Sequence, residues 1–214
     1  MSSTTAKRSS AKTKRRKKPK NGALAVLSIF VLLVLAVLLF FGLRGGYDTY
    51  VRSHFRLEHY DTVMKACDDF GMSPSLVYGI IRTESGFNER AHSVADARGL
   101  MQVTQTGLDW AQIRTDEFDG VTVNDLYNAD INIRCGVFLL SLLSEEFDSE
   151  QAVIAAYNAG IGNVEEWLED PAYSSDGTTL HTVPFEETRH YIDRVLSSKH
   201  IYQSYYQIDP EGEL

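Results

Sequence analysis

The stretch SPSLVYGIIRTESG, residues 73–86, predicts a helix that carries an acid. Ser73 followed by Pro74 is typical of a helix N-cap with a first-turn proline, and the apolar residues after them recur at helical spacing. Glu84 comes four residues after Ile80, just before the expected end of the helix. The helix would therefore present one carboxyl group on the same side as its apolar side chains.

Helical spacing continues on both sides of this stretch. Before it, residues 60–70 place apolar side chains at i, i+3, i+4 and i+7 and end at Gly71, a typical helix stop. After it, helices are predicted over residues 130–147, 149–160, 164–168 and 186–198. Residues 170–184 predict a long loop, and strand signals are weak. The sequence thus predicts an all-α domain, with residues 130–147 as its central helix because they are apolar nearly all round.

The chain as a whole has 214 residues, 43% of them hydrophobic and 23% charged. This composition excludes a disordered or collagen-like chain and favours one folded domain. Nine Lys and Arg residues and no acidic residue lie in the first 22 positions. The sequence predicts five segments: a disordered basic tail (1–22), a transmembrane helix (23–43), a stalk (44–56), a folded domain (57–202) and a C-terminal tail (203–214).

Residues 23–43 contain no charged side chain. As a helix that rises 1.5 Å per residue, they would span a bilayer core of about 30 Å. A buried helix of a soluble protein and a cleaved signal peptide are the alternatives, but the following residues, LRGGY (43–47), form no Ala-x-Ala cleavage site. Because basic residues precede the helix, the positive-inside rule predicts a single-pass protein with residues 1–22 in the cytoplasm and residues 44–214 outside.

Acidic residues dominate the rest of the chain. The sequence has 29 Asp and Glu against 21 Lys and Arg, a formal net charge of −8. Beyond residue 22 the net charge is −17, because 12 basic residues remain against all 29 acidic ones. We therefore expect no nucleic-acid partner for the folded domain, since neutralising phosphates requires clustered Lys and Arg.

The position of Glu84 favours acid–base chemistry. A carboxyl group beside apolar side chains loses part of its hydration, which disfavours its charged form and raises its pKa. A raised pKa is what a general acid needs near neutral pH. The alternative is a helix-end glutamate whose carboxylate bends out to solvent, and spacing alone does not decide between the two.

Four short motifs, the first of which begins with Glu84, follow one another within the length of one domain. They are ESGF (84–87), the segment from Ser93 to ARGLMQ (97–102), AYNAG (156–160) and ETRHY (187–191). In this order they resemble the soluble-lytic-transglycosylase family, the goose-lysozyme-like enzymes that cleave peptidoglycan. The resemblance covers residues 60–195, nearly the whole domain. It implies a lysozyme-like α-domain and peptidoglycan glycan strands as substrate. Together with the predicted anchor at residues 23–43, this places the chain in the bacterial cell membrane.

The resemblance also implies roles for particular residues. Glu84 matches the family's catalytic acid, and residues 99–102 match a segment that lines the cleft. Substrate binding is implied for Ser85, Ser93, Met101, Gln102, Tyr157, Asn158, Glu187 and Tyr191. Simpler interpretations stay open for three of these: Met101 as core packing, Tyr157 as a buried tyrosine with a satisfied hydroxyl, and Glu187 as a first-turn glutamate favoured by the helix dipole.

Two positions depart from the family pattern. Asp96 stands where the family usually has glycine, and Gly107 stands where threonine is common. We expect the first to alter a turn at the edge of the cleft and the second to weaken the start of a helix. Neither touches Glu84, so these departures bear on substrate fit more than on activity.

The family's chemistry implies cleavage of the β-1,4 bond between N-acetylmuramic acid and N-acetylglucosamine by one glutamate, acting first as acid and then as base. The muramic acid 6-hydroxyl would attack the anomeric carbon and leave a 1,6-anhydromuramoyl end. Lysozyme-type hydrolysis, with Glu89, Asp96 or Glu187 as a second carboxylate, is the alternative chemistry. A non-catalytic wall-binding or assembly module of an envelope-spanning machine is the alternative function, although such a module needs no acid on an apolar helix face.

Other kinds of site find little support in the sequence. The six histidines are scattered and no cysteine pair has ligand spacing, so we expect no metal and no cofactor. Ser85 has no base beside it in the sequence, and Gly-x-Ser-x-Gly is absent, which argues against a serine hydrolase. Cys67 and Cys135, both predicted outside the cell on apolar helix faces, are either a disulfide or two buried thiols. The sequence identifies no protein partner in the cell envelope.

Overall fold

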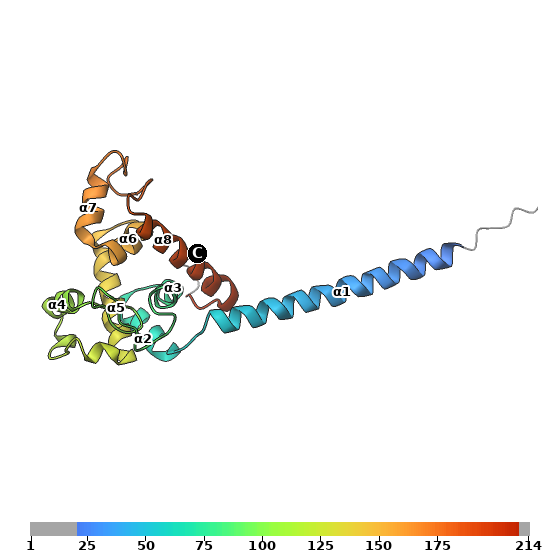
Figure 1. The fold of residues 1–214 in the computed structure, drawn as a ribbon, viewed down its shortest axis with the longest axis horizontal. Coiled ribbons are helices and arrows are strands. Elements are labelled where there is room, and N and C mark those ends of the chain that lie inside the picture. The colour runs from blue at the N-terminus through green and yellow to red at the C-terminus, as the bar shows by residue number, and fades with distance from the viewer. Residues whose placement is uncertain (1–20, 210–214) are drawn as a thin grey trace, which may run out of the picture. The chain divides into compact units, whose positions relative to one another are not determined.

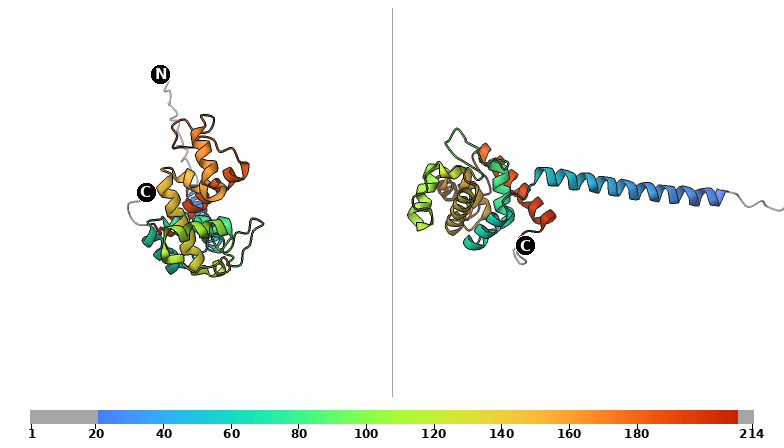
Figure 2. Two further views of the ribbon diagram at one scale, coloured as in Figure 1. Left: turned by 90° about the vertical axis from the view of Figure 1, so that its left-hand side faces the viewer. Right: turned by 90° about the horizontal axis from the view of Figure 1, so that it is seen from below.

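The computed structural model describes residues 21–209, so most of the predicted basic tail and residues 210–214 lie outside the described part. The chain divides into two compact units, Met1–Tyr50 and Val51–Leu214. Helix α1 (Asn21–His54) supplies the described part of the first unit, and its last turn belongs to the second. Figure 1 shows both parts, and Figure 2 gives two further views.

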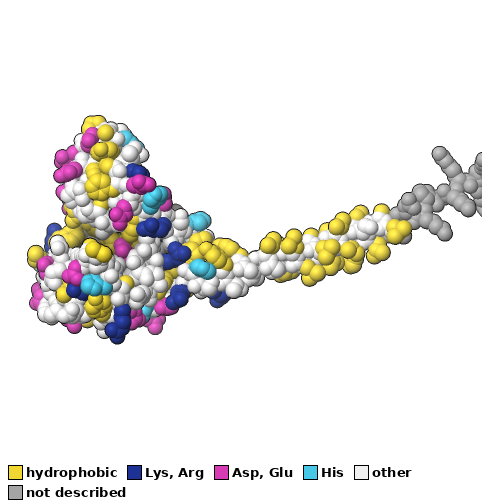
Figure 3. Space-filling view, viewed as in Figure 1, with side chains coloured by type: hydrophobic (Ala, Val, Ile, Leu, Met, Phe, Trp, Pro, Cys, Tyr) yellow, Lys and Arg dark blue, Asp and Glu magenta, His cyan; other side chains and the backbone are white. Residues whose placement is uncertain are grey.

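Helix α1 presents apolar side chains to its surroundings along most of its length. The residues from Leu24 to Leu43 are all exposed (Figure 3), and from Leu24 onward the helix is long and apolar enough to cross a membrane. Transfer of such a surface into hydrocarbon is favourable, and a helix satisfies its own backbone hydrogen bonds there. The predicted apolar N-terminal helix is therefore confirmed.

Helix α1 also continues through most of residues 44–56, where the sequence predicts a stalk. Its last turn packs into the second unit, because Val51 is fully buried and Phe55, four residues later, meets the Tyr202 ring edge-on with 5.7 Å between ring centroids. The i, i+4 spacing of two apolar residues is the sequence signal for this packing. The compact second unit thus begins at Val51, ahead of residue 57.

The second unit is helical, as predicted. Its described residues contain isolated β-bridges but no strand. The α-helices are α2 (Tyr60–Phe70), α3 (Pro74–Glu84), α4 (Gln105–Arg114), α5 (Ala129–Glu146), α6 (Glu150–Ala159), α7 (Ile161–Glu169) and α8 (Glu186–Ile201). Short 3₁₀ turns η1 (Asp116–Phe118) and η2 (Asp125–Tyr127) lead into α5, and a π-helical turn η3 (Tyr202–Tyr206) follows α8.

The predicted helices begin and end where local chemistry favours it. The Ser73 hydroxyl accepts a hydrogen bond from the Leu76 amide at 3.4 Å and caps α3. The Asn128 side chain caps α5 in the same way, by accepting from the amides of the first turn. Gly71 ends α2 with a φ of 69°, a conformation that glycine adopts without steric cost.

Helix α4 is absent from the sequence prediction. It has no apolar stripe, and its start is marked only by Thr104, whose hydroxyl accepts from the Gly107 amide at 3.1 Å. The amide of Gly107 completes this cap, and the weakening of the helix start expected from glycine stays a prediction. A Cβ at Gly107 would lie 3.1 Å from Leu139 Cδ1, so a larger residue here would press on α5.

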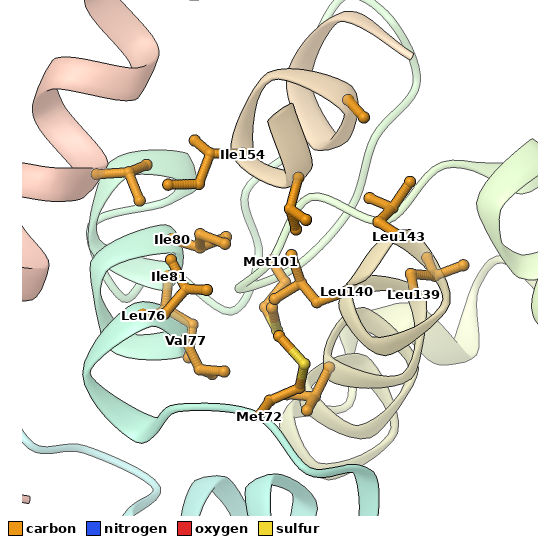
Figure 4. Packing of buried hydrophobic residues seen from close by; sticks show 14 of the residues in the cluster. Met72, Leu76, Val77, Ile80, Ile81, Met101, Leu139, Leu140, Leu143 and Ile154 are labelled. Carbon is orange, nitrogen blue, oxygen red and sulfur yellow. The ribbon is translucent and has the colours of Figure 1, made fainter. Parts of the chain in front are cut away.

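Helix α5 lies at the centre of the second unit, as predicted, with α2, α4 and α6 packed against it (Figures 1 and 2). Figure 4 shows Met101 in the core between Ile80 of α3 and Leu140 of α5. Gly136 makes room for it, because a Cβ there would lie 2.5 Å from Met101 Sδ. Helix α5 therefore supports the segment that carries the ARGLMQ motif.

The chain after α8 folds back onto the start of the second unit. We refer to residues 202–209 as the C-terminal clasp. Two tyrosines of the clasp donate hydrogen bonds to backbone carbonyls near the start of the unit, Tyr206 to Phe55 at 2.7 Å and Tyr202 to Arg56 at 3.0 Å. From α3, Arg82 and Tyr78 donate to the carbonyls of His54 and Glu58 at 3.0 and 3.1 Å. Asp209 Oδ1 accepts from the Ser73 hydroxyl and the Ser75 amide at the start of α3. Residues 203–209 of the predicted tail are thus folded onto the domain.

Candidate active site

The carboxyl group of Glu84 lies at the contact between α3 and α8. Glu84 is the last residue of α3, and the Tyr191 hydroxyl of α8 donates to Glu84 Oε1 at 2.7 Å. The Tyr191 side chain is buried, which shields this hydrogen bond from water and strengthens it. Two of the predicted motifs, 107 residues apart in the chain, therefore meet at one hydrogen bond.

Burial dominates the electrostatics of Glu84. It raises the pKa of the carboxyl from 4.5 to about 7, although the Tyr191 hydrogen bond and the positive charge of Arg194 both lower it. The group is therefore partly protonated at neutral pH and can give or take a proton there. A carboxylate bent out to solvent, the alternative from the sequence, does not describe this residue.

Tyr157 of α6 forms another side of the site. Its hydroxyl donates to the Met101 carbonyl oxygen at 2.8 Å. Burial first, and the negative charge of Glu84 second, raise the pKa of Tyr157 well above its ordinary value. The phenol is therefore neutral, and its oxygen can still accept a hydrogen bond.

Asn158 and Glu187 are also brought together, beside the start of α8. The Thr188 hydroxyl donates to Asn158 Oδ1 at 2.9 Å and joins α6 to the first turn of α8. Glu187 is exposed in that same turn, where the helix dipole favours a negative charge. Both a binding role and the simpler interpretation of Glu187 fit this position.

Two hollows flank the end of α6. The first, of about 520 Å³, has mostly apolar walls that include Gln102, Trp110 and Tyr157. The second, of about 580 Å³, is more polar and is lined by Asn158, Glu187 and their neighbours. Consecutive residues of α6 thus face two hollows whose size suits small ligands or parts of a chain-like one.

This arrangement has known relatives. Residues 61–178, more than half of the chain, match the transglycosylase SLT domain family. The chain belongs to this family. It is 33% identical over 165 residues to membrane-bound lytic murein transglycosylase C of Serratia proteamaculans, a match that covers 66% of this chain and 45% of that protein. It is 29% identical over 168 residues to the soluble lytic murein transglycosylase of Escherichia coli, covering 77% of this chain and 25% of that protein.

Solved structures share the fold of the SLT domain. Lytic transglycosylase Slt from Pseudomonas aeruginosa, solved as an inactive variant with a glutamate changed to glutamine, has a TM-score of 0.66 and 30% identity, over 75% of this chain and 26% of that one. The 70-kDa soluble lytic transglycosylase from Escherichia coli has a TM-score of 0.67 and 26% identity, over 77% and 27%. The predicted family and fold are confirmed. This chain spans less than half the length of these relatives.

Four predicted binding residues of the SLT domain are engaged within the protein. Ser85 Oγ donates to the Leu100 carbonyl at 2.8 Å, and Ser93 Oγ accepts from the Ala97 amide at 3.1 Å. Gln102 Nε2 donates to the carbonyls of Gly99 and Ala91 at 2.9 and 3.2 Å. The Met101 side chain is fully buried in the core. Core packing, the simpler interpretation of Met101, therefore describes its side chain here. Substrate contacts of Ser85, Ser93 and Gln102 stay predictions.

Asp96, the first departure from the SLT family pattern, has a φ of 61°. This left-handed conformation favours glycine, which gives the physical reason for the family's preference, and aspartate is among the residues that tolerate it. The carboxylate of Asp96 contacts His92 Nε2 at 2.6 Å and Arg98 Nη2 at 3.0 Å, and these contacts, the His92 hydrogen bond first, lower its pKa. The turn therefore accommodates aspartate at this position, and a change of the turn relative to the family stays a prediction.

Sequence reasoning missed two residues of this SLT domain. Arg194, one turn beyond Tyr191 on α8, supplies the positive charge that acts on Glu84. Asn132 is fully buried in α5 and bonds the backbone of the ARGLMQ segment. The signal for Asn132 was present, because a polar residue on the buried side of an apolar helix must have hydrogen-bond partners.

The described residues also bear on metal binding and on the two cysteines. Within residues 21–209 no group of three or more His, Cys, Asp and Glu side chains gathers that could hold a metal ion. Cys67 and Cys135 are both buried thiols in this structure. Burial raises the pKa of Cys135 to about 12, which makes this thiol a poor nucleophile.

Proposed function

We propose that this chain cleaves peptidoglycan as a lytic transglycosylase, with Glu84 as general acid and base. The observation that carries the proposal is the partly buried Glu84 carboxyl, with a pKa raised to about 7 and a hydrogen bond from Tyr191. Membership of the SLT family supports it, since its relatives are named lytic murein transglycosylases. The inactive Pseudomonas aeruginosa variant, in which glutamine replaces a glutamate, is in line with an essential glutamate.

The proposed reaction uses one carboxyl group. Protonated Glu84 gives its proton to the glycosidic oxygen between N-acetylmuramic acid and N-acetylglucosamine, and the bond from that oxygen to C1 breaks with help from the muramic acid N-acetyl group. The Glu84 carboxylate then takes the proton of the muramic acid 6-hydroxyl, whose oxygen bonds to C1. Glu84 ends protonated as it began, no water is consumed, and the product is a 1,6-anhydromuramoyl end.

Tyr191 suits both halves of this reaction. Burial of Glu84 favours the protonated acid that starts the reaction. Once the proton has left, the Tyr191 hydroxyl donates to the carboxylate and stabilises it until it acts as base. Burial raises the pKa of Glu84 and the Tyr191 hydrogen bond lowers it, so both the acid and the carboxylate are accessible near neutral pH.

We infer that the glycan strand occupies the two hollows beside α6. The aromatic side chains of Trp110 and Tyr157 in the first hollow suit the faces of sugar rings. Asn158 and Glu187 in the second offer hydrogen-bond partners to hydroxyl and N-acetyl groups. A net charge of −17 beyond residue 22 gives no attraction to an anionic wall, so recognition rests on contacts within these two hollows.

We further infer that residues 23–43 anchor the enzyme in the bacterial cytoplasmic membrane. The exposed apolar surface of α1 and the nine basic residues before it support a single pass, with the N-terminus inside and the SLT domain outside. The Serratia proteamaculans relative is named membrane-bound. This location would place the SLT domain on the side of the membrane where peptidoglycan lies.

The test is mass spectrometry of purified peptidoglycan digested by the full chain in non-ionic detergent, beside Glu84→Gln. Glu169→Gln is the matched control, because Glu169 also ends a helix but is exposed. We expect anhydromuropeptides from the wild type and the control and none from Glu84→Gln. Reducing ends would establish hydrolysis instead, and wall binding without any product would establish a non-catalytic module.

A further inference from the structure

Asn132 of α5 bonds the backbone of residues 98–101, the segment that connects two sides of the site. Its side chain is fully buried and makes three hydrogen bonds. Oδ1 accepts from the Met101 amide at 2.7 Å, and Nδ2 donates to the carbonyl oxygens of Arg98 and Leu126 at 2.8 and 2.9 Å. The amide oxygen and both amide hydrogens are thus used, which fixes the orientation of Asn132 and the backbone above it.

Two carbonyl groups of this segment reach opposite sides of the site. The Leu100 carbonyl accepts from the hydroxyl of Ser85, the residue directly after Glu84, at 2.8 Å. The Met101 carbonyl accepts from the Tyr157 hydroxyl at 2.8 Å. Hydrogen bonds therefore run from the Glu84 end of α3, through residues 98–101, to α6.

Close packing gives the segment a single position on α5. A Cβ at Gly99 would collide with the Asn132 side chain and the Leu126 carbonyl, and a Cβ at Gly136 would lie 2.5 Å from Met101 Sδ. At Gly99 the backbone of the segment thus lies directly on the Asn132 side chain, and at Gly136 the backbone of α5 lies directly on the Met101 side chain. The segment is therefore packed closely on α5, and Asn132 is its polar attachment to that helix. On its other side the Gly99 amide donates to the Ala91 carbonyl at 2.9 Å.

We propose that Asn132 is a positioning residue for the cleavage reaction: it sets the place of the Leu100 and Met101 carbonyls, and through them the place of Tyr157 and of the Ser85 end of α3. This inference rests on the proposed function. Asn132 does not act through the Tyr191–Glu84 hydrogen bond, because that bond comes from α8 and involves no atom of the segment.

The test measures kcat and KM of the full chain in detergent on soluble glycan fragments. For Asn132→Ala we expect kcat to fall by about 10²-fold, the loss that a displacement of about 1 Å can cause, with a smaller change in KM. The pH at which activity falls should match the wild type, since the contacts of Glu84 itself are kept. Ser174→Ala is the control, because Ser174 is also buried and hydrogen-bonded but lies in the loop before α8, and it should keep the wild-type kcat.

A purely structural role of Asn132 predicts a different pattern in a double variant. Tyr157→Phe removes the hydroxyl that the Met101 carbonyl holds. If Asn132 acts through this hydrogen bond, the double variant loses less activity than the product of the two single losses. Losses that simply multiply would overturn the proposal, and so would a folded Asn132→Ala variant with the wild-type kcat.

Asn132→Ala takes the partner from the Met101 amide and the Leu126 carbonyl, while the Arg98 carbonyl keeps the Val103 amide at 3.0 Å. Two buried polar groups without that partner threaten folding. Asn132→Ser is measured beside it, because the serine hydroxyl can serve one hydrogen bond and water can fill the space left. We expect its circular dichroism to match the wild type and its kcat to lie between the wild type and Asn132→Ala. A folded Asn132→Ser variant with unchanged kcat overturns the proposal. Failure of the proposed function is distinguishable, because then the wild type gives no anhydro product or Glu84→Gln gives as much.

Discussion

The Tyr191 hydroxyl stabilises the charged form of Glu84, so removal of this hydroxyl should raise the pKa of Glu84. In Tyr191→Phe the hydrogen bond that lowers the pKa of Glu84 is lost, and the pKa rises above about 7. Activity that needs the protonated acid should then persist to higher pH, while kcat falls by about 10-fold or more because the carboxylate loses its donor. The measurement is kcat against pH for both proteins. A decline that moves to lower pH would contradict this role of Tyr191.

The charged Glu84 carboxylate also lowers the free energy of unfolding at high pH. Its pKa is about 7 in the folded chain against 4.5 ordinarily, so the folded state binds the extra proton between these values and loses stability as pH rises through 7. Glu84→Gln mimics the protonated acid. We expect it to be more stable than the wild type at pH 8, by at most about 3 kcal/mol, and equally stable below pH 4.5. Urea unfolding in detergent at several pH values measures this difference, and a variant less stable at pH 8 would refute it.

At the scale of elements, the C-terminal clasp holds the N-terminus of α3. Asp209 Oδ1 accepts from the Ser73 hydroxyl and the Ser75 amide, as a capping side chain does. We expect Asp209→Ala to lower the free energy of unfolding by about 1 kcal/mol, and Asp209→Asn, which keeps an acceptor oxygen, to lower it less. Thermal or urea unfolding of the full chain checks this. Equal stability of all three proteins would show that the clasp does not cap α3.

Most helices could be predicted from the sequence because their own apolar spacing specifies them. Helices α2 and α3 have the expected bounds to within a residue. Helix α4 could not be predicted, because it has little apolar periodicity and tertiary packing stabilises it. The clasp could not be predicted either. Its tyrosines bond residues that are 146 and 151 positions away in the chain, and no local pattern reports such contacts.

Fewer features of the site than of the fold could be predicted from the sequence. Spacing alone left the environment of Glu84 open, and the order of the motifs gave Tyr157 and Tyr191 only through the resemblance. The side chain of Met101 was expected in the cleft but lies in the core, because Gly136 on another helix leaves space for it. Gly136 lies 35 residues from Met101 in the chain and acts by having no side chain, so the ARGLMQ motif alone could not predict this packing.

For the molecule as a whole, cleavage of peptidoglycan requires the SLT domain to lie outside the cytoplasm. Nine basic residues precede the apolar span, and under the positive-inside rule they favour the proposed orientation. A reporter that works only after export, fused after Leu214, should be active, and one that works only in the cytoplasm should be inactive. The reverse pattern would contradict the proposed topology and would separate the SLT domain from its proposed substrate.

The central claim is that the Glu84 carboxyl is a proton donor and acceptor at neutral pH. The most direct measurement is its titration by carbon-13 NMR of glutamate-labelled full chain in micelles, with Glu84→Gln to assign the signal. We expect a titration midpoint near pH 7, because burial raises the pKa of this carboxyl. A midpoint near 4.5, the ordinary value, would mean that the carboxyl is charged at neutral pH, and would contradict its role as the acid.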